Sequence, residues 1–461
     1  MLAAAVIRFH DLGRPPEIVF DEVYFVEQGR NYIAGKDFMD PHPPIAKLGI
    51  AAGIELLGDK PEGWRIVNAV VGTLLVPLMY GLARALFLSP VAAVAAGLLT
   101  TIDGLLIVDS RIAVIDIHYV TWAVAAYLLL IRMIRAGRLQ DLPRLIALGV
   151  LIGLSVGAKL YIPFFSFLLV LGTIALCGRQ AALASKIPWI PFVARPIVIV
   201  GAVASLVYVL SFLPHFLWGW WHSPLDLFKY ITIKVPEYQE AVKTMTHPYS
   251  SKWWTWPLML RPVWYFWKDP ADGPGTVAGI WGAGNPTIWW ASVPALVLAA
   301  WVAFRERRPA VAFVVAGWLI HVAPWVWIPR TLFLYHYLPS LLFALLALSW
   351  MLDRLWRGEG SPIERGLVGG ALLASVLPAC MNVAPTWGPV FFLGALLLYE
   401  GALISKRAAR VPVGPIAVAA WCLAAVVVTA YLFPIWVGSP ISKADWQSRM
   451  WISGSGFMNW I

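Results

Sequence analysis

Apolar runs of about 17–25 residues recur along the whole chain, and this repetition restricts the fold more than any other feature of the sequence. As an α-helix, a run of this length crosses the hydrocarbon core of a bilayer. Of the 461 residues, 60% are hydrophobic and 13% are charged, and no polar stretch is long enough to build a separate soluble domain. We therefore expect an all-α polytopic integral membrane protein, not a β-barrel of short alternating strands.

The runs predict about 11–13 transmembrane helices. The predicted spans are 65–88, 91–108, 112–131, 145–158, 161–177, 196–218, 286–304, 309–327, 331–351, 366–382, 388–404 and 412–436. One transmembrane catalytic domain then covers residues 1–436, and residues 437–461 form an outer tail. The stretch before Arg8 is too short to span, so we expect that the first helix is truncated.

Basic residues gather in alternate loops, and this pattern predicts the orientation. One set of loops holds 17 Lys and Arg against five Asp and Glu, so these loops are expected to face the cytoplasm. They also account for the net charge of +10 without a nucleic-acid partner. The segment 8–64 and the loop 219–285 then lie on the outer side. All eight histidines map to that side too, which indicates an active site at the outer membrane–water interface.

The sequence lacks the motifs of common soluble enzymes. It contains no Walker A loop, GxGxxG or HExxH motif, and its three cysteines form no CxxC pair. We therefore predict no cofactor and no metal ligands, although the residues leave a divalent metal open. An outward-facing site has no nucleotide supply, whereas a lipid-linked donor would place its phosphate at the headgroup level.

The segment 8–64 contains ten of the 25 acidic residues, including the adjacent pair Asp21 and Glu22. Two neighbouring carboxylates repel each other, so one tends to have a raised pKa unless a cation lies nearby. The pair is a candidate general base with an orienting partner, and the alternative is a solvated loop pair. Arg65 and Arg111 are the candidate cations.

Several outer residues are candidate ligands for a donor phosphate or another part of a substrate. His42 and Lys47 lie in "DPHPPIAKL", with Lys47 at headgroup level. Arg111 in "DSRIAVIDIHY" can clamp a phosphate, or it can pair with Asp109 or Asp116. Lys159 is either a snorkelling side chain or a phosphate ligand.

Two aromatic segments add further candidates. "HPYSSKWWTWPLMLRPVWYFW" is either an interfacial aromatic belt or a platform for a sugar or a polyprenyl chain, and its Arg261 is a phosphate candidate. "RTLFLYHYLPS" places Tyr335 and His336 beside Arg330 at the outer start of a span. That cluster is either an anchor or a substrate-binding element.

The order of "FDEVYF", "DPHPPIAKL", "GWRIVNAVVGTL", "DSRIAVIDIHY", "HPYSSKWWTWPLMLRPVWYFW", "GNPTIWW" and "FLYHYLPSLLFALLAL" resembles the protein O-mannosyltransferase family. The resemblance runs from residue 8 to about residue 350, and the chain looks like a bacterial-type member without the MIR domain. It implies the GT-C glycosyltransferase fold. It also implies that Asp21 is the base for a Ser/Thr hydroxyl, assisted by Glu22, and it matches Arg65 and Arg111 to family arginines. His336 falls in the family's Tyr-His-Tyr segment.

The implied reaction transfers mannose from polyprenyl-phosphate-mannose to Ser/Thr hydroxyls of exported proteins, outside the plasma membrane, in one inverting displacement. Phosphate is a good leaving group, so one carboxylate base with cations around the phosphate suffices. Further implied partners are membrane lipids and the protein export machinery. Two alternatives stay open: a GT-C transferase with a lipid or glycan acceptor, and a transporter, which would show inverted repeats and polar groups at the midplane.

Overall fold

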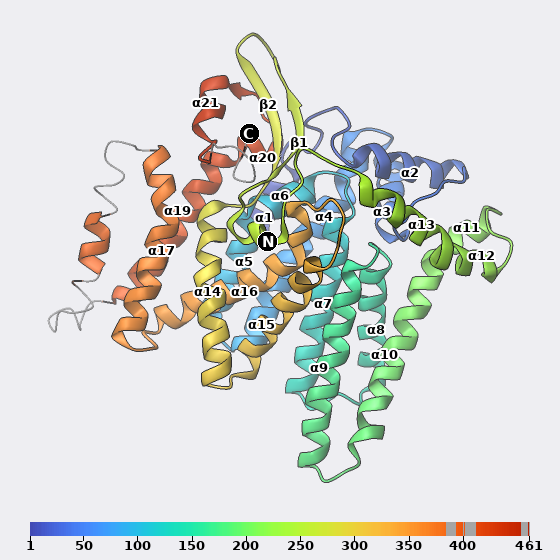
Figure 1. Cartoon of the computed structure of the whole chain (residues 1–461), viewed down its shortest axis with the longest axis horizontal. Coiled ribbons are helices and arrows are strands. Elements are labelled where there is room, and N and C mark those ends of the chain that lie inside the picture. Colours follow the sequence, from blue (N-terminus) through green and yellow to red (C-terminus); the bar gives the residue numbers. More distant parts are fainter. Residues whose placement is uncertain (384–392, 400, 402–411, 453–459, 461) are drawn as a thin grey trace. The chain divides into compact units, whose positions relative to one another are not determined.

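The computed structural model describes residues 1–383, 393–399, 401, 412–452 and 460, and most of this part is helical (Figure 1). Nine helices in it are long and apolar enough to cross a membrane. These are α4 (Pro61–Phe87), α7 (Asp116–Arg135), α9 (Ile162–Ala184), α10 (Trp189–Ser211), α14 (Pro286–Arg305), α15 (Pro309–Val322) with η4 (Ala323–Val326), η5 (Leu334–Tyr337) with α16 (Leu338–Trp356), α17 (Pro362–Val383) and α19 (Val413–Leu432). The prediction of a helical, multi-pass membrane protein is therefore confirmed.

The number of spans in the described part is nine, or ten if one bent pair counts, which is below the predicted 11–13. The predicted span 145–158 is α8 (Leu142–Val156), which has only 15 residues. The predicted span 388–404 lies mostly outside the described residues. The predicted span 196–218 ends early, because α10 stops at Ser211 and α11 (Leu213–Leu217) follows as a separate short helix.

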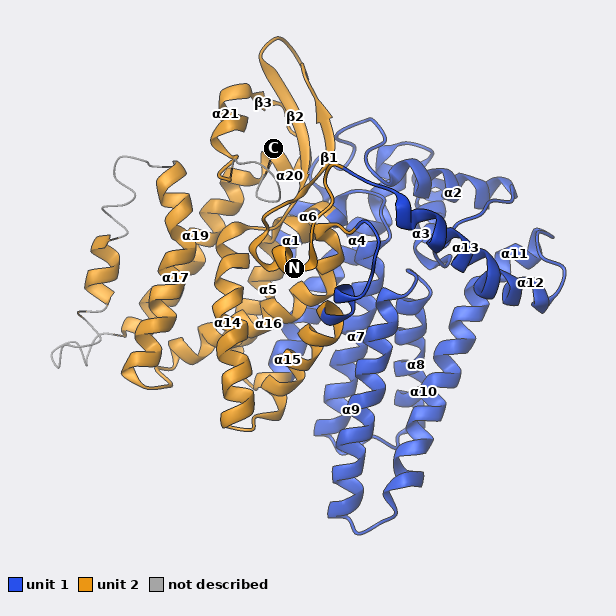
Figure 2. Ribbon diagram, viewed as in Figure 1, with its two compact units in different colours: residues 1–85, 109–247, 323–331 blue, residues 86–108, 248–322, 332–461 orange. Residues whose placement is uncertain are grey.

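The chain divides into two compact units (Figure 2). Unit 1 comprises residues 1–85, 109–247 and 323–331, and unit 2 comprises residues 86–108, 248–322 and 332–461. Both units are assembled from segments that lie far apart in the sequence. The predicted boundary at residue 436 between a catalytic domain and a tail does not coincide with this division, and it stays a prediction.

Unit 1 contains the whole of the predicted outer segment 8–64. This segment comprises the end of α1 (Leu2–Phe9), then α2 (Glu22–Ala34) and α3 (Ile45–Leu57), and it reaches the start of α4. Helix α2 ends at Gly35, whose φ of 66° is a left-handed conformation that glycine adopts without strain. Helix α3 follows and packs against α2. After α10, the chain continues through α11, α12 (Pro224–Lys229), the π-helix η1 (Tyr230–Lys234), α13 (Val235–Ala241) and η2 (Val242–Thr244).

In unit 2 the predicted span 91–108 is broken. Helices α5 (Pro90–Ile102) and α6 (Gly104–Arg111) meet at an angle of 56° around Asp103. The buried Asp103 carboxylate accepts hydrogen bonds from the Leu106 amide (3.2 Å) and from Trp289 Nε1 (2.7 Å). The Thr429 hydroxyl donates to the Ile102 carbonyl at 2.8 Å. Such side chains compensate the backbone groups that a helix break releases in a membrane.

The chain is mostly helical, as predicted, and unit 2 adds a small antiparallel sheet that the sequence analysis did not expect. Strands β1 (Val263–Lys268) and β2 (Thr276–Gly282) form a hairpin, and β3 (Ile441–Ser442) pairs with β2 (Figure 1). The segment Val263–Lys268 is rich in aromatic and β-branched residues, which favour strands. The remaining elements of unit 2 are η3 (Trp253–Leu258), α20 (Pro434–Val437) and α21 (Lys443–Ser448).

Candidate active site

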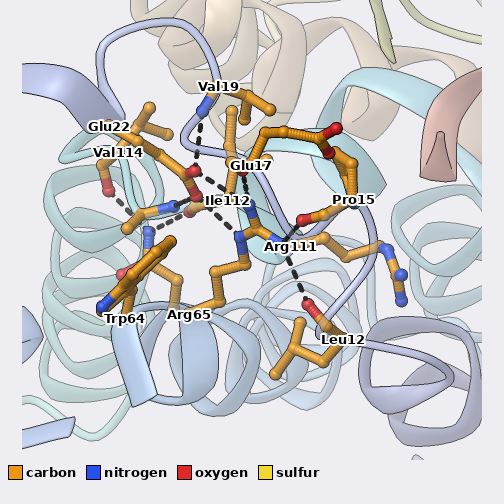
Figure 3. A network of polar contacts seen from close by, with 12 residues as sticks. Leu12, Pro15, Glu17, Val19, Glu22, Trp64, Arg65, Arg111, Ile112 and Val114 are labelled. Carbon is orange, nitrogen blue, oxygen red and sulfur yellow. Dashed lines mark hydrogen bonds and ion pairs between the residues drawn. The ribbon is translucent and has the colours of Figure 1, made fainter. Parts of the chain in front are cut away.

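The two adjacent acids, Asp21 and Glu22, have different environments. Glu22 is fully buried and forms a bidentate ion pair with Arg65, with Nε–Oε1 and Nη2–Oε2 distances of 2.7 and 2.9 Å (Figure 3). The same carboxylate accepts hydrogen bonds from the backbone amides of Val19 (3.0 Å) and Ala113 (2.8 Å). Glu22 therefore joins α2, α4 and the turn before α7.

The Arg65 guanidinium has no donor left for a substrate. A guanidinium carries five N–H donors. Two of those in Arg65 bind Glu22, and the other three bind the carbonyls of Leu12 (3.2 Å), Pro15 (2.8 Å) and Glu17 (3.0 Å) (Figure 3). Its side chain is 0% exposed. This geometry holds the loop before α2 in place, and phosphate binding by Arg65 stays a prediction that the observed contacts do not favour.

Arg111 likewise binds backbone carbonyls. Its Nη1 donates to the carbonyls of Ile7 (3.1 Å), Arg8 (3.1 Å) and His10 (2.6 Å), and its Nη2 donates to that of Asp11 (3.1 Å). These carbonyls lie at and just beyond the C-terminal end of α1, where helix carbonyls lack intrahelical partners. The two Nη atoms therefore bind backbone carbonyls, and not the carboxylate of Asp109 or Asp116 that the alternative predicted.

Asp21 directly precedes α2 and is half-buried. Burial raises the pKa of its carboxyl to about 6, while the positive charge of Lys159 lowers it and the negative charge of Asp116 raises it. Lys159 Nζ lies 2.6 Å from Asp116 Oδ1, in a nearly buried ion pair. A carboxyl whose pKa lies close to neutrality is suited to general-base chemistry.

His42 and Lys47 also lie in unit 1, beside α2. Lys47 is buried and forms an ion pair with Asp40, and it donates a second hydrogen bond to the His42 carbonyl. Burial lowers the pKa of Lys47, and Asp40 opposes that shift. Tyr230 of η1 donates to the Asp40 carbonyl. The primary partner of Lys47 is thus a carboxylate of the protein, and phosphate binding by Lys47 stays a prediction.

The His42 ring is kept neutral by its surroundings. Burial lowers its pKa to about 3, against the effect of Asp40 and with further lowering by Lys159, Lys47 and Arg330. The ring centroid lies 6.3 Å from that of Phe25, one turn after Asp21 on α2. A neutral imidazole can donate or accept a hydrogen bond but supplies no positive charge to a phosphate.

A cavity of about 390 Å³ opens beside these residues in unit 1. Its walls combine aromatic rings with charged side chains. They are Tyr32, Asp37, Phe38, Met39, Asp40, His42, Lys47, His215, Trp220, Trp221, Asp226, Lys229, Tyr230 and Lys234. The cavity connects the predicted His42–Lys47 segment with the helices that follow α10, a proximity that no sequence motif indicated.

The other three predicted site residues belong to unit 2. Arg261 Nη2 donates to the Pro248 carbonyl at 2.6 Å. His336 is buried and its ring stacks on Tyr335, with centroids 4.6 Å apart, and on Trp256, with centroids 6.0 Å apart. Its Nδ1 lies 3.0 Å from both the amide and the carbonyl of Phe333. The "LYHY" segment is therefore a packed aromatic cluster around the start of α16.

The sequence analysis did not identify as site residues two aspartates that lie among these residues of unit 1. Asp116 was considered only as a partner of Arg111, whereas it pairs with Lys159. Asp40 was not considered as the partner of Lys47. For the metal question, no group of three His, Cys, Asp or Glu side chains suited to a metal ion occurs among the residues that the structure describes.

Comparison with known proteins extends along nearly the whole chain. The family model described as dolichyl-phosphate-mannose-protein mannosyltransferase matches residues 1–65 and 62–218, and that of the C-terminal four-helix membrane region of protein O-mannosyltransferase matches residues 224–455. A polyprenol-phosphate-mannose–protein mannosyltransferase of Mycolicibacterium smegmatis is 27% identical, over 97% of this chain and 90% of its own length. The corresponding protein of Corynebacterium glutamicum is 28% identical, over 81% of this chain and 84% of its own.

Solved structures agree with the family match at the level of the fold. A protein O-mannosyltransferase complex of S. cerevisiae bound to the sugar donor superposes with a TM-score of 0.77, at 15% identity, over 98% of this chain and 91% of that chain. ArnT of Cupriavidus metallidurans bound to undecaprenyl phosphate gives a TM-score of 0.57, at 16% identity, over 95% and 75%. The fold is that of the GT-C glycosyltransferases. This chain is a multi-pass membrane glycosyltransferase that belongs to the protein O-mannosyltransferase family.

Proposed function

We propose that the protein transfers mannose from a polyprenyl-phosphate-mannose donor to Ser/Thr hydroxyls of exported polypeptides. The near-full-length similarity to bacterial enzymes named for this reaction supports the donor and the protein acceptor. The alternation of basic loops supports an active site on the extracytoplasmic side of the plasma membrane. Membrane lipids surround the enzyme, and the protein export machinery is a candidate partner that would deliver unfolded acceptors.

The observation that carries the proposal is the state of Asp21. Its carboxyl has a pKa of about 6, whereas its neighbour Glu22 is held in the ion pair with Arg65. Asp21 is therefore the member of the acidic pair that can exchange a proton with a substrate. At neutral pH it is largely ionised, as a general base must be.

In the proposed displacement, the Asp21 carboxylate takes the proton of the Ser or Thr hydroxyl. The hydroxyl oxygen attacks C1 of mannose, and the C1–O bond to the phosphate breaks. The bonding electrons leave with the polyprenyl phosphate, so no proton donor is required, and a single attack from the opposite face inverts the configuration at C1. For Glu22, Arg65 and Arg111 we propose a positioning role, because the backbone carbonyls and amides that they bind belong to the segments around Asp21.

Transfer of labelled mannose to a Ser/Thr-rich peptide, in membranes containing the protein, tests this function. Wild type should label the peptide, and Asp21→Asn should not. Glu55→Gln is the matched control, because Glu55 is an exposed acid of the same segment and is expected to retain transfer. Retention of activity by Asp21→Asn would remove the assigned base. Label in a lipid or glycan, with the peptide blank, would instead identify a GT-C transferase with another acceptor.

A further inference from the structure

Arg330 is a half-buried arginine of unit 1 that follows η4 in the chain. Its Nη1 donates to Gln239 Oε1 of α13 at 3.0 Å, and its Nε lies 3.5 Å from the carbonyl of Thr331. The Thr331 hydroxyl in turn donates to the Met245 carbonyl. Arg330 is therefore held in place by neutral groups, and its side chain forms no ion pair with a carboxylate of the described residues.

This bonding pattern differs from that of the other buried cations near Asp21. Arg65 uses all five donors on Glu22 and three carbonyls, and Arg111 binds four carbonyls. Lys47 and Lys159 each form an ion pair with an aspartate. Arg330 differs from them in having no carboxylate partner among the described residues and in having N–H donors that the described contacts do not use.

A series of contacts leads from Arg330 toward Lys159, whose positive charge lowers the pKa of the predicted base Asp21. Gln239 lies on α13, directly after η1, whose Tyr230 donates to the Asp40 carbonyl. From Asp40 the contacts continue to Lys47 and to the amide of His42. The Leu160 amide then approaches His42 Nδ1 at 3.5 Å, next to Lys159.

Arg330 and Asp21 both act on the pKa of Tyr238, a residue of α13. The pKa of Tyr238 on α13 is raised, first by burial and then by Asp40. Arg330 opposes that shift, whereas Tyr24 and Asp21 add to it. The pKa of this one tyrosine is thus affected by both the guanidinium of Arg330 and the carboxyl of Asp21.

We propose that Arg330, oriented by Gln239, binds the phosphoryl group of the lipid-linked donor. This inference rests on the proposed function and assigns the cation that the reaction requires. A guanidinium presents a planar fork of donors that matches two phosphate oxygens. As the C1–O bond breaks, negative charge grows on the phosphate, so a fixed cation stabilises the transition state more than the ground state.

Binding to the full chain in detergent, without any acceptor, tests the assignment separately from transfer. The probes are undecaprenyl phosphate, undecaprenol and inorganic phosphate, and the readout is quenching of tryptophan fluorescence. Arg330→Gln should weaken binding of undecaprenyl phosphate by roughly 10- to 100-fold, the range expected for lost hydrogen bonds to a charged group. Undecaprenol, which lacks the phosphate, should bind wild type and variant alike.

A second variant leaves Arg330 intact. Gln239→Glu places a carboxylate where Arg330 now has an amide partner, so it should neutralise the guanidinium and weaken undecaprenyl phosphate binding in the same direction. Lys243→Gln is the matched control, because it removes one positive charge from an exposed side chain of η2 that is already paired with Glu240. That control should bind like wild type.

The outcomes are decisive in both directions. Competition by inorganic phosphate in wild type that is lost in Arg330→Gln would support recognition of the phosphoryl group itself. Unchanged undecaprenyl phosphate binding in Arg330→Gln would overturn the proposal, as would equal losses for the phosphate and the alcohol. Because the assay contains no acceptor, loss of transfer in Asp21→Asn with intact phosphate binding would leave the assignment of Arg330 in place.

Discussion

Glu22 and Asp21 are adjacent in the chain, yet the regions around them differ in how completely their polar groups are bonded. Around Glu22, the carboxylate and the guanidinium of Arg65 make their hydrogen bonds within the protein, with both side chains fully buried. Around Asp21, a half-buried carboxyl faces the charges of Lys159 and Asp116 and keeps a raised pKa. The region around Glu22, where the polar groups are fully hydrogen-bonded, supports the chain. The region around Asp21 retains a carboxyl that can react.

The largest expected effect is on catalysis, through Asp21. Replacing it by Asn removes the base without changing the side chain's shape, so mannose transfer should fall by roughly 10²- to 10⁴-fold, the usual contribution of a general base. Thermal unfolding in detergent should stay close to that of wild type. A stable Asp21→Asn protein with wild-type transfer would erase the contrast between the two acids.

The next effect concerns stability, through Glu22. Glu22→Gln leaves the fully buried Arg65 charge without its counter-ion, and breaking a buried pair in this way costs about 3–5 kcal/mol. We expect a clear drop in the unfolding temperature and a loss of activity that follows the loss of folded protein. If Glu22→Gln instead lowered transfer in protein as stable as wild type, then Glu22 would act on the substrate.

A smaller stability effect is expected at the break between α5 and α6 in unit 2. Asn285→Ala removes the hydrogen bonds from Nδ2 to the Ala425 carbonyl and to Thr429 Oγ1, both 2.9 Å long. The Thr429 hydroxyl keeps its bond to the Ile102 carbonyl, so the cost is that of the lost hydrogen bonds, each worth about 0.5–1.5 kcal/mol. Thermal unfolding should show this loss, and the pH dependence of transfer by the remaining folded protein should not move. A shifted profile would contradict the structural role.

The smallest expected effect is a shift in the pH at which kcat/KM declines on the acid side. Because the base must be ionised, kcat/KM should decline as the pH falls through about 6, the pKa of Asp21. Asp116→Asn removes a neighbouring negative charge, so it should lower that pKa and extend activity to more acidic pH. Lys159→Gln removes the stabilising cation and should move this decline to higher pH. Profiles of both variants that coincide with wild type would show that this pair does not tune the base.

The fold class could be predicted from the sequence, because the length of an apolar run is a local property. Which of two adjacent acids turns inward could not. That choice depends on Arg65, 43 residues away, and on an amide at Ala113, 91 residues away. The local sequence around Asp21 and Glu22 does not indicate which of the two acids will contact these distant partners.

At two other places the structure differs from the prediction although the sequence contained an indication of it. Asp103 interrupts an apolar run, and a polar residue inside a span marks a site that needs partners. The aromatic stretch of β1 was taken as an interfacial belt or a ligand platform, although it is followed by "DPADGPG", which is typical of a turn between strands. In both places local composition was compatible with two structures, and partners from distant segments decided between them.

The pairing of β3 with β2 sets an order for the making of this protein. Residues Ile441–Ser442 complete the sheet, and Trp460 donates from Nε1 to the Met259 carbonyl at 2.9 Å while its own carbonyl accepts from Trp264 Nε1 at 2.9 Å. The loop that contains η3 and β1 is synthesised some 180 residues before these partners. It can reach its final form only after α19 has been made, so maturation of this loop waits for the last part of the chain to be translated.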